Sequence, residues 1–186
     1  MTEQSIICNG RRFRPYISAA EIEQSVMQVA AKMNHDLRDL RDDQGRGVLL
    51  LPVLNGAYMF AADLSRHLEI DAEICFVKMS SYEGTSTTGK LHELIGFPGS
   101  LAGRHVVVVE DVVDTGLSMQ QIISQLHRLG VASVRVCTFL FKPGKFRCNY
   151  QVDYVGRNID NEFIVGYGLD YDEHGRLYRE IYILDE

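Results

Sequence analysis

The chain has 186 residues, the usual size of one domain and too short for two ordinary ones. Hydrophobic residues make up 46% of the chain and charged residues 24%, which are globular proportions. It carries 19 Lys and Arg against 25 Asp and Glu, a formal net charge of −6. This balance disfavours a protein that coats nucleic acid, because such a protein needs a basic face to neutralise phosphates.

The short apolar runs and the scattered cysteines disfavour a membrane protein, a secreted protein and a zinc site. The aliphatic runs are much shorter than the ~20 residues that cross a bilayer, and no secretory signal is visible. We therefore expect no membrane partner and a cytoplasmic location. The four cysteines are scattered, and none forms a CxxC pair or a zinc-ligand pattern with histidine, so we expect free thiols.

Helix-like and strand-like segments alternate along the chain. Ser18 and Glu21 fit a capping box, and apolar residues at helical spacing predict a helix that runs to about Leu37. Helices are also predicted over 57–68 and 119–129, and strands over 48–53, 74–79, 106–109 and 134–141. Residues 80–90 are polar and predict a surface loop, and short strands are expected after residue 152. The alternation predicts an α/β fold with a mainly parallel sheet.

The most informative segment is VVVVEDVVDTGLS, residues 106–118. A valine strand delivers Glu110 and Asp111, then Asp114, to a Gly-containing turn that opens a helix. Ligands of open α/β sheets bind beyond the carboxyl ends of strands, and a helix N-terminus binds phosphate through backbone N–H groups. Adjacent carboxylates suit a vicinal diol, directly or through Mg²⁺. Helix capping accounts for Asp114 but not for the two earlier acids.

This segment resembles the phosphoribosyl diphosphate (PRPP) binding signature of the type I phosphoribosyltransferases. Residues 54–57, LNGA, are similar to the pyrophosphate loop of the hypoxanthine-guanine branch, and 163–171, FIVGYGLDY, to its purine-site segment. The resemblance covers nearly the whole chain, in family order. It implies a single domain with the type I phosphoribosyltransferase fold: a core over about 18–149, a small hood from about 1–17 and 150–186, and a flexible lid loop that begins near Ser81 and Tyr82.

The resemblance also implies roles for residues around PRPP. Glu110 and Asp111 hold the ribose hydroxyls and bind Mg²⁺, and Asp114 is the general acid/base near N7 of the purine. The 5′-phosphate is held by the turn residues Thr115, Gly116, Leu117 and Ser118. Pyrophosphate is contacted by Leu54, Asn55, Gly56 and Arg176, although the family usually carries a basic residue where this chain has Asn55.

Further implied roles concern the base. Lys142 donates to the purine O6, Phe163 stacks on the ring, and the backbone of Ile164 meets the Watson–Crick edge. Asp170 belongs to the same site and binds a second Mg²⁺. Lys142 would distinguish a 6-oxo base, which accepts a hydrogen bond, from adenine, whose 6-amino group donates.

The implied activity is transfer of a phosphoribosyl group from PRPP to hypoxanthine or guanine by a homodimer or homotetramer. One alternative is a regulatory protein of the same fold that senses PRPP and binds nucleic acid, which the acidic charge disfavours. Another is a transferase for xanthine or a different base. An ATPase is excluded, because the P-loop-like residues 84–91, GTSTTGKL, end in Leu91 where a hydroxyl is required.

Overall fold

The computed structural model describes residues 4–80, 92–95 and 99–185. The described part contains a seven-stranded sheet with the strand order β6-β5-β3-β7-β8-β9, and β4 pairs with β3 beside this path. All neighbouring strands in it are parallel except β5 and β6. Its strands are β3 (Val48–Leu54), β4 (Ala72–Ile74), β5 (Val77–Ser80), β6 (His92–Ile95), β7 (His105–Val113), β8 (Ser133–Phe141) and β9 (Tyr154–Asn158). The predicted α/β class with a mainly parallel sheet is confirmed.

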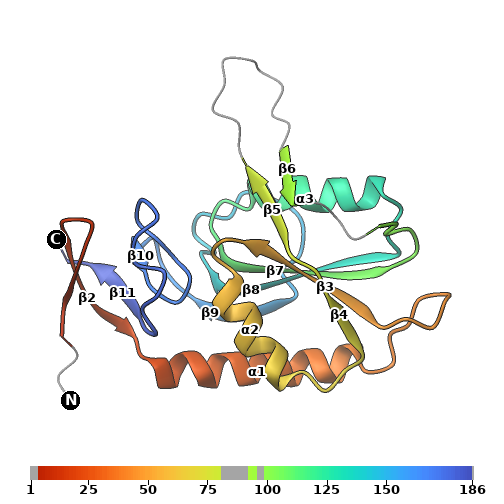
Figure 1. Cartoon of the computed structure of the whole chain (residues 1–186), viewed down its shortest axis with the longest axis horizontal. Coiled ribbons are helices and arrows are strands. Elements are labelled where there is room, and N and C mark those ends of the chain that lie inside the picture. The colour runs from red at the N-terminus through yellow and green to blue at the C-terminus, as the bar shows by residue number, and fades with distance from the viewer. Residues whose placement is uncertain (1–3, 81–91, 96–98, 186) are drawn as a thin grey trace.

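A smaller antiparallel sheet lies at one end of the molecule, where both ends of the chain are found (Figure 1). Its order is β1-β2-β11-β10, formed by β1 (Ile6–Cys8), β2 (Arg11–Ile17), β11 (Ile181–Leu184) and β10 (Ile164–Val165). This sheet corresponds to the expected hood. Because β9 pairs with β8 in the larger sheet, residues 150–186 are divided between the two sheets.

Helices cover both faces of the larger sheet. α1 (Ala19–Leu37) and α2 (Tyr58–His67) pack with Val107 and Val109 of β7, whereas α3 (Leu117–Arg128) packs with Val106 and Val108. Side chains alternate between the faces of a strand, so burial on both faces requires a continuous apolar run, as the valines of β7 provide. In the described part of the chain, no helix is both long and apolar enough to span a bilayer.

Local sequence signals account for most element boundaries. The capping box is confirmed: Ser18 Oγ accepts from the Glu21 N–H, and the Glu21 carboxylate accepts from the Ser18 N–H. The prediction of a single strand over 74–79 is wrong. β4 pairs with Val48–Leu50 and β5 pairs farther along β3, so the strand is interrupted between them. β7 extends past residue 109 to Val113 because it continues to pair with β8.

Candidate active site at the carboxyl ends of the strands

The turn between β7 and α3 is shaped by one glycine. Gly116 is the N-cap of α3 with φ +84°, and a Cβ at this position would lie 2.6 Å from Cε2 of Phe146. Glycine is favoured by both the left-handed backbone and the close approach of the ring. Since glycine has no side chain, it cannot cap the N–H groups of the first turn of α3, and a helix start of this kind is suited to an anion.

A cavity of about 120 Å³ lies beside this turn. This is several times the ~10–15 Å³ that a cavity needs to hold one water molecule, which is room for a phosphate-sized group. Leu117, which the sequence placed in the phosphate-binding set, is 55% exposed. The predicted residues that line the cavity are Glu110, Asp114, Thr115, Gly116 and Ser118.

Asp111 contacts a different segment from Glu110. A Cβ built on Gly56 would overlap the carboxylate of Asp111, and a Cβ on Gly168 would overlap the carbonyl oxygen of Gly56. The peptide between Leu54 and Asn55, just before this contact, is cis. The strand β7 and the segment 163–171 therefore both meet the loop after β3 at Gly56. Neighbouring side chains of a strand alternate in direction, so the two acids have different neighbours, although the charge of Asp111 still acts on Glu110.

Asp114 has two differently occupied carboxylate oxygens. The Nζ atoms of Lys142 and Lys145 each lie 3.3 Å from its Oδ2. Its Oδ1 is buried and has no hydrogen-bond partner among the residues described. A buried acceptor without a partner is costly, so Oδ1 is suited to receive a donor from a ligand.

The predicted purine-site residues lie next to Asp114. Lys142 is buried and donates to the backbone oxygen of Glu162 at 2.9 Å, directly before Phe163. The Phe163 ring is 44% exposed, and Tyr171 meets it edge-on at a centroid distance of 5.3 Å. An exposed ring held by a second ring can stack on a planar ligand. Ile164 is buried in β10, opposite Ile183 of β11.

Asp170 and Arg176 form an ion pair. Asp170 Oδ1 lies 2.8 Å from Nη2 of Arg176, and its Oδ2 accepts from the Glu173 N–H at 2.8 Å. Arg176 also donates to the backbone oxygen of Gly168 at 2.9 Å, while its Nε is buried without a partner in the described structure. The arginine is thus fixed beside Gly168 and keeps one donor for a ligand.

Burial changes the acidity of both acids on β7. Burial, together with the negative charge of Asp111, raises the pKa of Glu110 well above its usual value. Burial raises the pKa of Asp111 to about 6; hydrogen bonds and the Arg176 charge oppose this, and the Asp170 charge adds to it. A cation would therefore be attracted to the region where Asp111 and Asp170 interact.

The carboxylates of the site suit Mg²⁺ better than a metal ion whose ligands are all protein side chains. Within the described ranges, no group of three or more His, Cys, Asp or Glu side chains is arranged to hold a metal. Mg²⁺ does not need such a group, because it commonly takes one or two carboxylates and completes its shell with water and substrate phosphates. Asp111 and Asp170, coupled electrostatically, offer oxygen ligands of that kind.

The sequence analysis assigned no individual role to three contributors to the site, two of which lie in the predicted purine-site segment 163–171. Lys145 contacts Asp114, Tyr171 supports the Phe163 ring, and Gly168 allows the close approach of Gly56. Lys145 could have been found from its place in the sequence, because it follows Lys142 by three residues across a Pro-Gly turn. The roles of the other two depend on long-range contacts. Ser81 and Tyr82, the predicted lid residues, lie outside the described residues.

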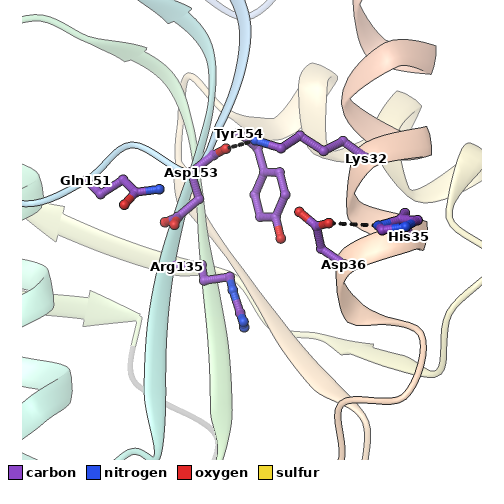
Figure 2. Close-up of a pocket in the computed structure, with 7 residues that line it drawn as sticks. All are labelled: Lys32, His35, Asp36, Arg135, Gln151, Asp153 and Tyr154. Atoms are coloured by element: carbon purple, nitrogen blue, oxygen red, sulfur yellow. Dashed lines mark hydrogen bonds and ion pairs between the residues drawn. The ribbon is translucent and has the colours of Figure 1, made fainter.

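Larger cavities lie elsewhere. One of about 440 Å³ is shown in Figure 2, where Lys32, His35 and Asp36 of α1 face Arg135 of β8 and the segment that leads into β9. Arg135 is near the start of β8 and Lys142 directly follows its end, so this cavity and the candidate site are at opposite ends of the strand. Its charges are mixed, with two acids beside Lys32 and Arg135. Another cavity, of about 670 Å³, lies between α1, α2 and Arg179.

Comparison with known proteins places this site in a family. The sequence pattern of the family described as "Phosphoribosyl transferase domain" matches residues 18–172. The chain belongs to the phosphoribosyltransferase family. A hypoxanthine-guanine phosphoribosyltransferase of Mycobacterium tuberculosis is 38% identical over 161 residues, which are 86% of this chain and 80% of that protein. The hypoxanthine phosphoribosyltransferase of Escherichia coli is 33% identical over 161 residues, 86% of this chain and 88% of that protein.

Solved structures show the same fold. A crystal structure of a hypoxanthine-guanine phosphoribosyltransferase from Bacillus anthracis has a TM-score of 0.82 and 32% identity, over 92% of this chain and 98% of that one. A hypoxanthine phosphoribosyltransferase from Trypanosoma cruzi has a TM-score of 0.84 and 32% identity, over 92% and 91% of the two chains. The phosphoribosyltransferase fold predicted from the sequence is confirmed, with the smaller antiparallel sheet as its hood.

Proposed function

We propose that this phosphoribosyltransferase acts in purine salvage and transfers the 5-phosphoribosyl group from PRPP to N9 of hypoxanthine or guanine. The products are IMP or GMP and pyrophosphate. The observation that carries the proposal is Asp114: lysines hold one of its oxygens, and the other is buried without a partner in the described structure. It lies between the glycine turn of α3 and Lys142, which donates to the backbone oxygen of Glu162, the residue before Phe163.

The base binds through its ring faces and its 6-oxo group. Phe163 stacks on the purine, Lys142 donates to O6, and the backbone of Ile164 meets the Watson–Crick edge. As N9 attacks C1 of the ribose, the base must lose a proton, and Asp114 Oδ1 accepts it from N7. The C1–oxygen bond to pyrophosphate breaks, and its electron pair leaves with pyrophosphate.

The phosphoribosyl part occupies the cavity beside α3 and the loop after β3. The 5′-phosphate accepts hydrogen bonds from the turn Thr115–Ser118, and the acids of β7 bind the ribose hydroxyls. Pyrophosphate lies against the loop 54–56 and Arg176. Positive charge develops on the ribose and negative charge on the leaving group, so donors fixed near the phosphates stabilise the transition state.

Magnesium is the cofactor that the donor set fits. Asp111 and Asp170 would hold it, and the carboxylate of Glu110, the neighbour of Asp111 in β7, would add negative charge beside them. When bound, the ion would neutralise the negative charge of the pyrophosphate group. Arg176 then keeps Asp170 in place through their ion pair.

The test is an assay with purified protein, PRPP and Mg²⁺, in which hypoxanthine, guanine, xanthine, adenine and uracil are supplied one at a time. We expect nucleotide from hypoxanthine or guanine and none from adenine or uracil. Absence of product with every 6-oxopurine would refute the proposal. Product from xanthine alone would assign the transferase to a different base.

Assembly and location complete the proposal. We expect a homodimer or homotetramer, in line with the Trypanosoma cruzi enzyme, whose structure was used to study its oligomeric state. Light scattering after size-exclusion chromatography measures this. The four cysteines are free thiols, as in proteins of a reducing compartment, which supports a cytoplasmic location.

A further inference from the structure

Two lysines contact the same oxygen of one carboxylate. Lys142 and Lys145 approach Asp114 Oδ2 at equal distances of 3.3 Å, and neither contact involves Oδ1. Lys142 is additionally bound to the backbone oxygen of Glu162. For Lys145, the described residues offer its side chain Asp114 as partner and no other. The ammonium group of Lys142 is therefore held by two acceptors, whereas that of Lys145 is held by Asp114 alone among the described residues.

A tight turn places Lys145 at this position. The N–H groups of Lys145 and Phe146 both donate to the carbonyl oxygen of Lys142, at 3.0 and 3.2 Å. Phe146 packs edge-on against Phe141 and Tyr150 and lies over Gly116. The turn is thus fixed between the end of β8 and the glycine turn of α3, and the Lys145 side chain, 38% exposed, extends from it toward Asp114.

The proposed base binding requires Lys142 to share its donors. An ammonium group carries three donors, so the 6-oxo oxygen of a purine would take the third donor of Lys142, beside its bonds to Asp114 and Glu162. Lys142 is then shared among three acceptors, and a second cation on Oδ2 helps to keep Asp114 oriented with Oδ1 toward the base. Lys145 already occupies this place.

We infer that Lys145 is a positioning residue for the transfer reaction. It holds Oδ2 of Asp114 while the base occupies Lys142, so that Oδ1 keeps the direction in which it accepts the purine proton. Lys142 thus serves chiefly base affinity, and Lys145 serves the rate of the chemical step. This inference rests on the proposed function, because it assigns Asp114 the proton.

The experiment compares four variants with the wild type: Lys145→Met, Lys145→Arg, Lys142→Met and the control Lys32→Met. Lys32 of α1 suits as the control because it lines the cavity of Figure 2, which reaches β8 at the end opposite to the site, and its replacement removes the same charge. Single-turnover rates at saturating PRPP report the chemical step, and steady-state assays give KM for the base and for PRPP. Thermal unfolding shows whether each variant is folded.

For Lys145→Met we expect the single-turnover rate to fall about tenfold or more, part of the ~100- to 10,000-fold that a positioned general base contributes. KM for the base should stay within about twofold, because Lys142 is intact. Lys145→Arg should recover most of the rate, since it restores the cation. Lys142→Met should raise KM for the base at least about tenfold, the value of one charge-assisted hydrogen bond.

The outcomes separate this inference from the proposed function. A wild type without turnover refutes the function itself. If the wild type is active and folded Lys145→Met reacts at the rate of Lys32→Met, the inference is overturned. It is equally overturned if Lys145→Met raises KM for PRPP while the saturated rate is unchanged, because Lys145 would then bind phosphate instead of orienting Asp114.

Discussion

The carboxylate of Asp111 occupies the space in which a side chain at Gly56 would begin. The two residues come from the end of β7 and from the loop after β3, so this contact fixes the distance between the segments proposed to bind ribose and pyrophosphate. Gly168 approaches Gly56 just as closely from the third segment. The junction of these three segments therefore depends on Gly56 and Gly168, because any carbon added at either must move a neighbour.

Replacing Gly56 should disturb the site directly. Gly56→Ala places a methyl group against the Asp111 carboxylate, and we expect kcat/KM for PRPP to fall at least about tenfold, because small displacements of positioning groups are costly. Gly144→Ala is the matched control, since a Cβ there meets nothing within 4 Å. Equal activity of the two variants would contradict the close packing of Gly56 on Asp111.

Asp111 should make the stability of the metal-free protein depend on pH. Burial raises its pKa to about 6, so the folded state binds this proton more tightly than the unfolded state does. The resulting stabilisation is complete below the pKa of the unfolded chain, near 3.8, and is lost as the pH rises through about 6. Above that pH the folded protein carries a buried negative charge.

The variant Asp111→Asn removes this titration while keeping the shape of the side chain. At pH 7.5 we expect its free energy of unfolding to exceed that of the wild type by about 1–3 kcal/mol, and the difference to shrink towards pH 5. Urea unfolding with a chelator present measures both. A difference that is the same at both pH values would show that burial does not control this carboxyl group.

Asp114 is expected to control the chemical step. Asn has the same shape but cannot take up a proton, so Asp114→Asn should lower the single-turnover rate about 100-fold or more. Its thermal unfolding should stay close to that of the wild type, because the side chain is partly exposed. An unchanged rate would show that another group accepts the purine proton.

The core beneath the site should be sensitive to the loss of a ring. Phe139 of β8 is buried and contacts the rings of Phe60 and Tyr167 at 5.3 and 5.0 Å. We expect Phe139→Ala to lower the free energy of unfolding by about 3–5 kcal/mol, whereas Leu177→Ala, at an exposed position, should change it by less than about 0.5 kcal/mol. Denaturant unfolding of both variants measures the contrast.

Local signals in the sequence were sufficient for much of the fold. The capping pair of Ser18 and Glu21 marked the start of α1, and the valine run of β7 marked a strand buried on both faces. The hood was harder to predict in detail. β2 pairs with β11 from the other end of the chain, and a pairing over such a separation leaves no periodic trace in either segment.

The candidate site also has parts that the sequence predicts and parts that depend on long-range contacts. The glycine turn after β7 was readable because residue types and spacing alone determine a helix start of this kind. The partners of Asp114 could not be predicted: the family resemblance gave Lys142 as a base-binding residue, but its contact with Asp114, like that of Lys145, depends on the turn that follows β8. The ion pair of Asp170 with Arg176 also depends on how the chain folds back between them.

The alternation along β7 gives Glu110 and Asp111 separate surroundings, although they are neighbours in the chain. One lines the cavity beside α3, and the other contacts the loop that precedes α2. Substitutions around α3 can therefore alter the surroundings of the first acid without moving the second. A one-residue insertion or deletion within the valine run, by contrast, would send each acid to the wrong face of the sheet.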